Sequence, residues 1–430
     1  MIQINNLNIL KKKTIFLAPY NDLTQSLYEL IKGYCNIIGY IDNFKADTNN
    51  NIFTSKENLL EYDYIIIHSP NFWIEILKEF PIKKVLLLKN NTLINIEEYK
   101  KSLISYKNTA EVLFYPHNQA HTLDMIPIIE ELKKFGIKTI VIKSNLNKKF
   151  VDKISTLEKV DIDVVFTDLI DYKIFICFVD WHELGPILVD FSHKRNKSTI
   201  GIVEGVTDFK DSDYKLKRNA YGRVKYIFAT GENDLKYLKN KKSFVVGIPK
   251  MKKQLNEKIY FPPKTLVIIN LSFVALNYND DSIYWLEDIV NTCESLKLNY
   301  LISQHPSDKT DLTNFINITD LSIYDAIKIG TIIISRFSTV ILESLAYGKP
   351  VVYYKPKKET NTLFNNNFNS FSIANNKKEL KKAILYELSQ KDTIREKSNL
   401  FLHKQCNINS KDNSSYLAAK YIKKILESNN

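Results

Sequence analysis

The sequence lacks any apolar run that approaches the roughly 18 residues of a membrane-spanning helix, so we expect no membrane span. The start of the chain has polar Asn residues where a signal peptide needs an apolar stretch, so we expect no secretion signal. Four cysteines, Cys35, Cys177, Cys293 and Cys406, lie far apart and fit no metal-binding spacing. They are expected to be reduced thiols of a cytosolic protein.

Glycine is missing from the first predicted strand-to-helix turn. The strand predicted at Thr14–Leu17 is followed by APYND, whereas a dinucleotide site needs glycines there so that the backbone can approach a pyrophosphate. We therefore expect no NAD binding, despite Asp42 at the end of the second predicted strand. The chain also carries no RNA-binding motif or zinc finger and its lysines are spread along it, so no nucleic-acid partner is expected.

The composition is that of a soluble globular protein with two or three domains. The chain has 430 residues, of which 44% are hydrophobic and 25% charged. Lys and Arg number 60 and Asp and Glu 48, which gives a net charge of +12. Part of this charge is attributed to an AT-rich genome. The rest suits nucleotide phosphates, an acidic glycan or the inner-membrane surface, so we expect a cytoplasmic protein, peripheral at that membrane.

Short apolar strands alternate with amphipathic helices, which predicts an α/β fold with parallel sheets. We predict a Rossmann-like module in residues 1–105, a second block in 106–250 and a third in 251–430. The last two form lobes that face a cleft. A final amphipathic helix at Asn413–Leu426 is expected to return to the second block. Strands are predicted at Thr14–Leu17, Asn36–Ile41, Tyr62–Ile67, Lys84–Leu88, Glu111–Tyr115, Lys138–Ile142, Val164–Phe166, Ile174–Phe178, Ser198–Val203, Tyr226–Ala229, Phe244–Val246, Thr265–Asn270, Tyr300–Ser303, Ile332–Ser335 and Val351–Tyr354, and helices at Asp22–Ile31 and 125–136.

Two motifs in the third block predict a phosphate site. The stretch ISQHPSD puts His305 and Pro306 directly after a predicted strand, and IIISRFSTVILESLAYGKPVVYY puts Ser338 and Thr339 at the start of a predicted helix. Hydroxyls and free backbone N–H groups at a helix start bind anions. The alternatives are a histidine at a strand end and an ordinary helix cap.

Three neighbours of this turn are further candidates for donor binding. Ser335 ends the preceding strand, Arg336 lies beside the turn, and Glu343 follows within the helix, where it would reach a donor hydroxyl. For Arg336 and Glu343 the alternative is a solvated side chain at the surface or at the edge of the core.

These motifs resemble two groups of transferases. The His-Pro pair followed by Ser-Thr is similar to bacterial sialyltransferases and capsule polysialyltransferases. The stretch from Ser335 through GKPVVYY resembles the CDP-glycerol glycerophosphotransferase and capsule polymerase group. The resemblance implies a GT-B fold for the second and third blocks. It also implies that His305 stabilises the leaving CMP phosphate and that Ser338 and Thr339 bind it.

The first block carries a different resemblance. The stretch IIGYIDNFKADTNNNIFTSKENLLEYDYIII is similar to the N-terminal module of sugar O- and N-acyltransferases. The left-handed helix repeat of those enzymes does not follow. We therefore interpret residues 1–105 as an accessory or docking module.

The second block should supply the general base. In IGIVEGVTDF, Glu204 and Gly205 follow a predicted strand, and Asp208 is a nearby alternate. Sialyltransferases have an acidic-acidic-Gly motif here, in which one carboxylate deprotonates the acceptor hydroxyl. Because Val203 stands in place of the first acid, that role does not pass to Glu204 automatically, and a simple strand-end turn remains the alternative.

The loop PHNQAHTLD offers a second base. His117 follows a predicted strand at the cleft, and His121 and Asp124 lie around the start of the next helix as acceptor-binding candidates. An imidazole with a near-neutral pKa suits base catalysis. A helix cap is the alternative for Asp124, and a surface imidazole for His121.

The loop DWHELGP places His182 and Glu183 toward the same cleft, with His182 as an acceptor-binding candidate. No His-x-x-x-His or Asp-x-Asp pattern falls in a convincing site, so we predict no essential metal. Lys250 and Arg336 are the cations expected to neutralise the leaving phosphate instead.

Together these features predict an inverting, metal-independent glycosyltransferase that needs no cofactor beyond its nucleotide-activated donor. It would move a sugar or polyol phosphate from a CMP- or CDP-linked donor to a capsule or lipooligosaccharide acceptor, either a free glycan or a lipid-linked one. One alternative is a UDP-sugar 2-epimerase-like enzyme, although RFST stands where a glycine-containing turn would be expected. The other is a non-catalytic scaffold for glycan assembly.

Overall fold

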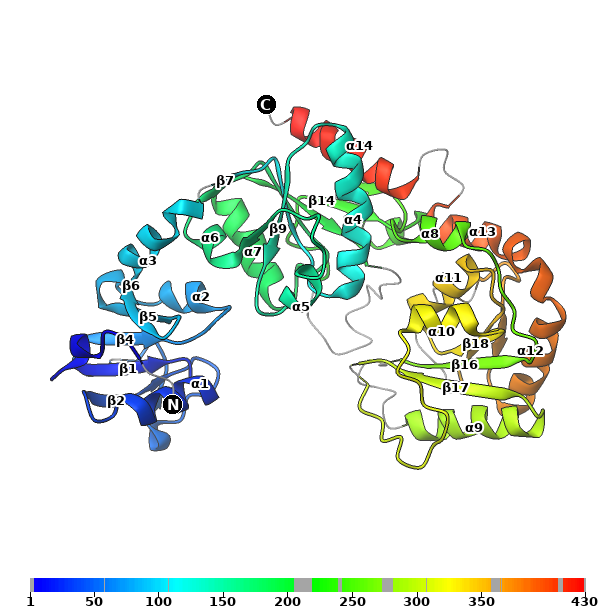
Figure 1. Ribbon diagram of the computed structural model, residues 1–430, viewed down its shortest axis with the longest axis horizontal. Coiled ribbons are helices and arrows are strands. Elements are labelled where there is room, and N and C mark those ends of the chain that lie inside the picture. The colour runs from blue at the N-terminus through cyan, green and yellow to red at the C-terminus, as the bar shows by residue number, and fades with distance from the viewer. Residues whose placement is uncertain are drawn as a thin grey trace. The chain divides into compact units, whose positions relative to one another are not determined.

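The protein is described by a computed structural model over residues 4–57, 59–106, 108–204, 219–238, 242–272, 281–306, 308–356, 364, 366–408 and 413–428 (Figure 1). The chain forms two compact units. The first unit comprises residues 1–118, 138–175 and 183–197, and the second comprises residues 119–137, 176–182 and 198–430.

A six-stranded sheet occupies the N-terminal part of the first unit, in the order β3-β2-β1-β4-β5-β6. All its pairs are parallel except β5 with β6. Asn21 caps the first α-helix, because its side chain accepts from the Thr24 backbone N–H, and the helix buries Leu27 and Ile31 against the sheet. The elements are β1 (Thr14–Ala18), α1 (Asp22–Ile31), β2 (Asn36–Ile41), β3 (Ile52–Phe53), β4 (Tyr64–Ile67), α2 (Trp73–Leu77), β5 (Val85–Lys89), β6 (Thr92–Asn95) and α3 (Ile96–Leu103).

A seven-stranded sheet has the order β10-β9-β8-β12-β13-β14-β15, in which β8 with β9, β9 with β10, β13 with β14 and β14 with β15 pair in parallel. Its strands are β8 (Val112–Tyr115), β9 (Thr139–Lys143), β10 (Lys159–Asp161), β12 (Ile174–Cys177), β13 (Ser198–Ile202), β14 (Tyr226–Ala229) and β15 (Lys242–Val245). The remaining elements of this region are α4 (Gln119–Lys134), α5 (Lys148–Val151), α6 (Ile162–Phe166), α7 (Leu184–Lys194) and the two-stranded sheet of β7 (Asn108–Thr109) and β11 (Ile170–Asp171).

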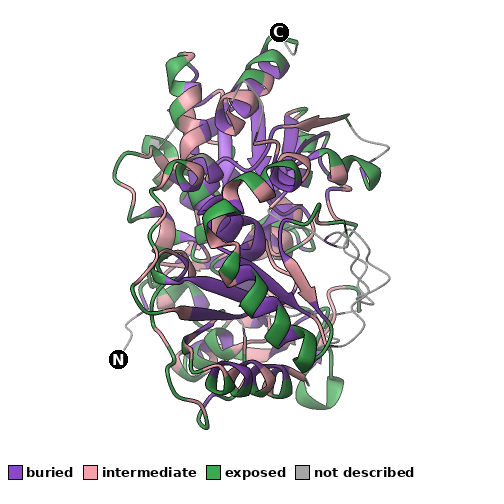
Figure 2. Ribbon diagram, turned by 90° about the vertical axis from the view of Figure 1, so that its right-hand side faces the viewer, coloured by how far each residue is buried: buried purple, intermediate pink, exposed green. Residues whose placement is uncertain are grey.

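A five-stranded parallel sheet in the second unit has the order β17-β16-β18-β19-β20. Apolar clusters cover both of its faces, as is usual for a parallel sheet. In Figure 2 the strands are largely coloured as buried, whereas many helical turns are exposed. The elements are α8 (Met251–Asn256), β16 (Leu266–Leu271), α9 (Ser282–Ser295), β17 (Asn299–Gln304), α10 (Ile323–Ile329), β18 (Ile332–Ser335), α11 (Thr339–Ala346), β19 (Val351–Tyr354), β20 (Ser372–Ala374), α12 (Lys377–Ser389), α13 (Ile394–Cys406) and α14 (Ser414–Ser428).

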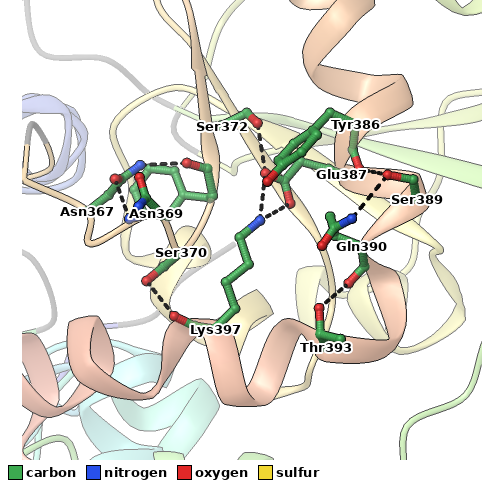
Figure 3. A network of polar contacts seen from close by, with 11 residues as sticks. Asn367, Asn369, Ser370, Ser372, Tyr386, Glu387, Ser389, Gln390, Thr393 and Lys397 are labelled. Atoms are coloured by element: carbon green, nitrogen blue, oxygen red, sulfur yellow. Dashed lines mark hydrogen bonds and ion pairs between the residues drawn. The ribbon is translucent and has the colours of Figure 1, made fainter.

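A buried ion pair holds α12 to α13 beside β20 (Figure 3). The carboxylate of Glu387 is fully buried, and both its oxygens lie 3.1 Å from Nζ of Lys397. The hydroxyl of Ser372 donates to the same carboxylate at 2.7 Å. The pair is balanced in charge and joins residues only ten positions apart.

The final helix, α14, packs against α4, where the rings of Phe135 and Tyr416 lie 5.9 Å apart. Tyr421 stacks on Phe244 of β15 at 4.4 Å. Among the described residues, no helix is both long enough and apolar enough to cross a membrane.

Two predicted elements were wrong. Val164–Phe166 belongs to α6 rather than to a strand, and the strand at that point is β10. A short, fully buried apolar run fits either structure, so its pattern could not decide. The helix predicted to start at residue 125 begins at Gln119, so His121 and Asp124 lie inside α4. Its first turns face polar groups, and the apolar periodicity therefore starts late.

Candidate active site

The site is built around a contact between His121 on α4 and Glu204 after β13, both in the second unit. Nε2 of His121 lies within hydrogen-bonding distance of Oε2 of Glu204. The imidazole is fully buried and stacks on the ring of Phe178 at 4.7 Å, whereas 37% of the Glu204 side chain is exposed. A buried imidazole therefore stands behind a carboxylate that solvent reaches.

Tyr221 positions the backbone of Glu204. Its hydroxyl accepts from the Glu204 N–H at 3.1 Å and lies 3.1 Å from the carbonyl of Phe178, to which it donates. The buried carboxylate of Asp180 accepts from the backbone N–H groups of Tyr221 and Arg223, each at 2.7 Å. Hydrogen bonds thus orient the residues around the candidate base, as a catalytic group requires.

A second group of charges lies one helical turn further along α4. Asp124 is three residues after His121, so both side chains lie on one face of the helix. The backbone N–H of Lys250 donates to Asp124 at 3.2 Å, and its Nζ lies 3.7 Å from the other carboxylate oxygen. The same Nζ lies 3.0 Å from Glu343 on α11 and 3.4 Å from the hydroxyl of Tyr324. We call these five residues, Glu204, His121, Asp124, Lys250 and Glu343, the polar network.

Burial dominates the electrostatics of the polar network. It raises the pKa of Asp124 and of Glu343, whose side chains are 6% and 3% exposed. Burial alone would lower the pKa of Lys250, but the two carboxylates outweigh it and hold that pKa well above its ordinary value. Lys250 is therefore a permanent cation between two carboxylates that hold protons more readily than usual.

The predicted phosphate turn lies at the carboxyl end of β18. Ser338 is the N-cap of α11, and its hydroxyl accepts from the Val340 N–H at 3.2 Å. Ser338 and Thr339 are both partly exposed. The cap and the two hydroxyls thus leave a polar helix start at the edge of the sheet.

Ser335 and Arg336 support this turn from inside. The Ser335 hydroxyl is fully buried, donates to the Arg336 carbonyl at 2.8 Å and accepts from Asn270 at 2.9 Å. Arg336 is 3% exposed, so the alternative of surface display was wrong for it.

His305 follows β17 at the same edge of the sheet, and its backbone N–H donates to the carbonyl of Leu271 at the end of β16. Both His305 and Pro306 are exposed. Because β16 lies between β17 and β18, His305 and the Ser338 turn are two strand spacings apart, which is about 10 Å. The structure therefore brings both motifs to one edge of the sheet.

The Gly-Lys-Pro part of the motif is structural. Gly348 ends α11 with a φ of +74°, and an added Cβ there would lie 2.6 Å from Ile259. Nζ of Lys349, which is 2% exposed, donates to the carbonyls of Lys328 at 2.8 Å and Gly330 at 2.6 Å. These contacts fasten the end of α11 to the end of α10.

Other predicted site residues lie elsewhere or outside the described part. Nδ1 of His117 lies 3.2 Å from Glu183, the residue before α7, and His182 is exposed. Gly205 and Asp208 fall outside the described residues. Of the loop PHNQAHTLD, only His121 and Asp124 belong to the polar network.

Sequence reasoning missed Phe178, Tyr221 and Tyr324, which support the polar network. Phe178 follows a strand, Tyr221 lies in a turn and Tyr324 lies in the first turn of a helix. An aromatic residue at any of these positions gives no signal of such a role. The carboxylate of Glu343 lies 3.0 Å from Nζ of Lys250, and its predicted contact with a donor hydroxyl stays a prediction.

No protein-family model matches the sequence, and no curated protein matches it. Among solved structures the chain is similar to a putative UDP-N-acetylglucosamine 2-epimerase from Listeria monocytogenes, at 13% identity and a TM-score of 0.54 over 74% of this chain and 96% of that one. A UDP-GlcNAc 2-epimerase from Neisseria meningitidis bound to UDP-GlcNAc has 13% identity and a TM-score of 0.51 over 74% and 100%. The wall teichoic acid polymerase TagF has 15% identity and a TM-score of 0.50 over 74% and 89%.

These neighbours are GT-B fold proteins, and the predicted α/β fold class of GT-B type is confirmed. At such identities the likeness extends to the fold alone. The resemblance to sialyltransferases and the roles of the site residues stay predictions.

Proposed function

We propose that this chain transfers a sugar or polyol phosphate from a nucleotide-activated donor, CMP- or CDP-linked, to a surface-glycan acceptor. The observation that carries the proposal is the polar network. It joins a solvent-reachable carboxylate, Glu204, to a buried imidazole and then, through α4, to a buried cation. The phosphate turn opens α11, the same helix that supplies Glu343 to this network.

In the proposed reaction Glu204 is the general base. It takes the proton of the acceptor hydroxyl while the acceptor oxygen forms a bond to the donor's electrophilic centre and the bond to the leaving nucleotide phosphate breaks. His121 is a positioning residue that holds the Glu204 carboxylate. A displacement of this kind inverts the configuration of that centre.

The leaving phosphate would bind at the phosphate turn. The Ser338 and Thr339 hydroxyls and the N-terminus of α11 supply donors, and His305 contributes from the same sheet edge. Lys250 acts indirectly, by holding Asp124 and Glu343 in place. The proposed mechanism uses no metal and no further cofactor.

The donor half of the proposal is tested by calorimetry with CMP, CDP and UDP. We expect CMP or CDP to bind best and the double variant Ser338→Ala/Thr339→Ala to weaken that binding by at least tenfold. The matched control is Ser322→Ala, which removes a helix-capping hydroxyl from the start of α10. Unchanged affinity of the double variant for all three nucleotides would place the phosphate elsewhere.

The catalytic half is tested by turnover with a cognate donor and acceptor. Glu204→Gln should lower kcat by roughly 100-fold to 10,000-fold, because general-base catalysis contributes that much. Conversion of UDP-N-acetylglucosamine to its 2-epimer without any acceptor would replace the proposal by the epimerase alternative. Absence of both reactions, with no nucleotide bound, would favour the scaffold.

A further inference from the structure

A cavity of about 620 Å³, separate from the polar network, is lined by residues of the first unit alone. Its wall is formed by residues at the carboxyl ends of strands from two different parallel sheets. His68 follows β4 and Asn90 follows β5 of the six-stranded sheet, while Lys143 ends β9 and Asp161 ends β10 of the seven-stranded sheet. In open α/β sheets, ligands bind at the carboxyl ends of the strands.

The two sides of this cavity are held together by one carboxylate. Asp163 on α6 accepts from Trp73 Nε1 at 2.5 Å and from Lys89 Nζ at 2.6 Å, and Tyr99 donates to it as well. Lys89 and Asp163 are each 16% exposed, and Lys89 also lies over the rings of Trp73 and Tyr99 at 5.1 and 5.3 Å. The charges of Asp163 and Lys89 are therefore matched by each other, which leaves the remaining polar groups of the wall for a ligand.

The remaining wall offers both donors and acceptors. Nζ of Lys143 lies 3.6 Å from Asp161 and 3.8 Å from Asp152, beyond a normal hydrogen bond. Lys148 is exposed and makes no ion pair within the described part of the chain. Burial lowers the pKa of His68, and its buried Nδ1 has no hydrogen-bond partner among the described residues.

This mixture fits a saccharide better than a nucleobase. Each sugar hydroxyl both donates and accepts, and the wall supplies ammonium and amide donors beside carboxylate and imidazole acceptors. A nucleobase usually stacks on an aromatic ring, whereas Lys89 lies over the ring of Tyr99, and the other apolar residues of the wall, Pro70, Leu88, Leu103 and Ile162, are aliphatic. The two lysines, Lys143 and Lys148, would receive an acidic substituent of the sugar.

We propose that this cavity binds a short acidic glycan segment. The proposal goes beyond the proposed function, because none of its residues belongs to the polar network or to the phosphate turn. It holds for a transferase that retains its polymer and equally for an enzyme of another reaction class. The acidic group is a carboxylate or a phosphodiester, and the experiment separates the two.

The test is calorimetry on the full chain with three probes: a sialic acid dimer, a glycerol phosphate trimer and neutral maltotriose. We expect one of the acidic probes to bind at least tenfold more tightly than maltotriose. The variant Lys143→Ala/Lys148→Ala should weaken that binding at least tenfold, and Lys143→Arg should retain most of it. The matched control, Lys149→Ala/Lys153→Ala, removes the same charge from exposed positions nearby and should change the affinity less than twofold.

Three outcomes would overturn the proposal. The first is no binding of any probe, and the second is an equal loss in the control variant, which would indicate attraction by net charge alone. Displacement of the bound probe by CDP would also overturn it, because the glycan would then occupy the donor site. Since binding is measured without turnover, an inactive Glu204→Gln protein that still binds the probe would separate this proposal from the proposed function.

Discussion

Two largely shielded lysines of the second unit, Lys250 and Lys397, which are 12% and 15% exposed, differ in the number of carboxylates that face them. Lys397 faces one carboxylate, Glu387, ten residues away, with both oxygens at 3.1 Å. Lys250 lies between Asp124 and Glu343, which are far apart in the sequence, at 3.7 and 3.0 Å. One site is a matched pair between neighbouring helices, and the other has one more carboxylate than cations.

The difference shows which charges serve the fold. A buried, matched pair roughly balances its own desolvation and tells little about function. An excess buried carboxylate costs stability, and such groups with shifted pKa values gather at functional sites. Burial raises the pKa of Glu387 as well, so it is the excess carboxylate, and not the pKa shift, that distinguishes the polar network as the candidate site.

The largest effect is expected from Lys250→Met. The change leaves Asp124 and Glu343 buried without a cation, which should lower the free energy of unfolding by about 3–5 kcal/mol. Urea denaturation measures it, with the exposed Lys253→Met on the same helix as the control. A loss below about 1 kcal/mol, as for a surface ion pair, would mean that water already solvates these carboxylates. The Lys250 site would then no longer differ from the Lys397 pair in the way proposed.

A smaller loss is expected from Glu387→Gln. It leaves Lys397, which is 15% exposed, without its carboxylate, at a cost of about 2 kcal/mol. The double variant Glu387→Gln/Lys397→Met should return to within about 1 kcal/mol of the wild type, because no unpaired charge remains. Both proteins should keep normal turnover. A drop in kcat at equal stability would show that the matched pair also serves the reaction.

The smallest change in stability is expected from Glu343→Gln, which turns the Lys250 site into a matched pair. Its free energy of unfolding should stay within about 1 kcal/mol of the wild type. Burial raises the pKa of Glu343, so this carboxyl stabilises the fold below its unfolded pKa, and that contribution is lost as pH rises through the raised value.

The variant should therefore show a flatter dependence of stability on pH in the range that begins at the ordinary glutamate pKa of about 4.3 and extends upward from it. Unfolding midpoints across that range test this, with the exposed Glu396→Gln as the control. If the dependence of stability on pH is the same as in the wild type, Glu343 is ionised over the whole range. The charges around Lys250 would then differ no more from neutrality than those of the Lys397 pair.

Local patterns were sufficient for most secondary structure. The helix predicted at Asp22–Ile31 and the strand predicted at Asn36–Ile41 have those bounds in the structure. These elements are recognisable from the spacing of their apolar residues and from the Asn21 cap, and both signals involve residues only a few positions apart. The short buried α6 and the polar first turns of α4 were missed, because their surroundings come from distant parts of the chain.

The candidate site was predictable only in part. Ser338 was recognisable because a polar turn followed by an apolar helix is a local signal. In the cavity of the first unit, the partners of Asp163 were not recognisable, since Trp73, Lys89 and Tyr99 precede it by 90, 74 and 64 positions. A chain without the predicted accessory module, residues 1–105, would leave Asp163 without these three hydrogen-bond donors.

By itself, the sequence determined the alternation of strands and helices, the α/β class and the polar turn capped by Ser338 before α11. These follow from side-chain period and helix capping, which act over a few residues. Only the tertiary structure decided that His121 lies against Glu204 and that Lys250 lies between Asp124 and Glu343. A charge chooses its partner by distance in space and by exclusion of water, and neither quantity is written in the spacing of residues along the chain.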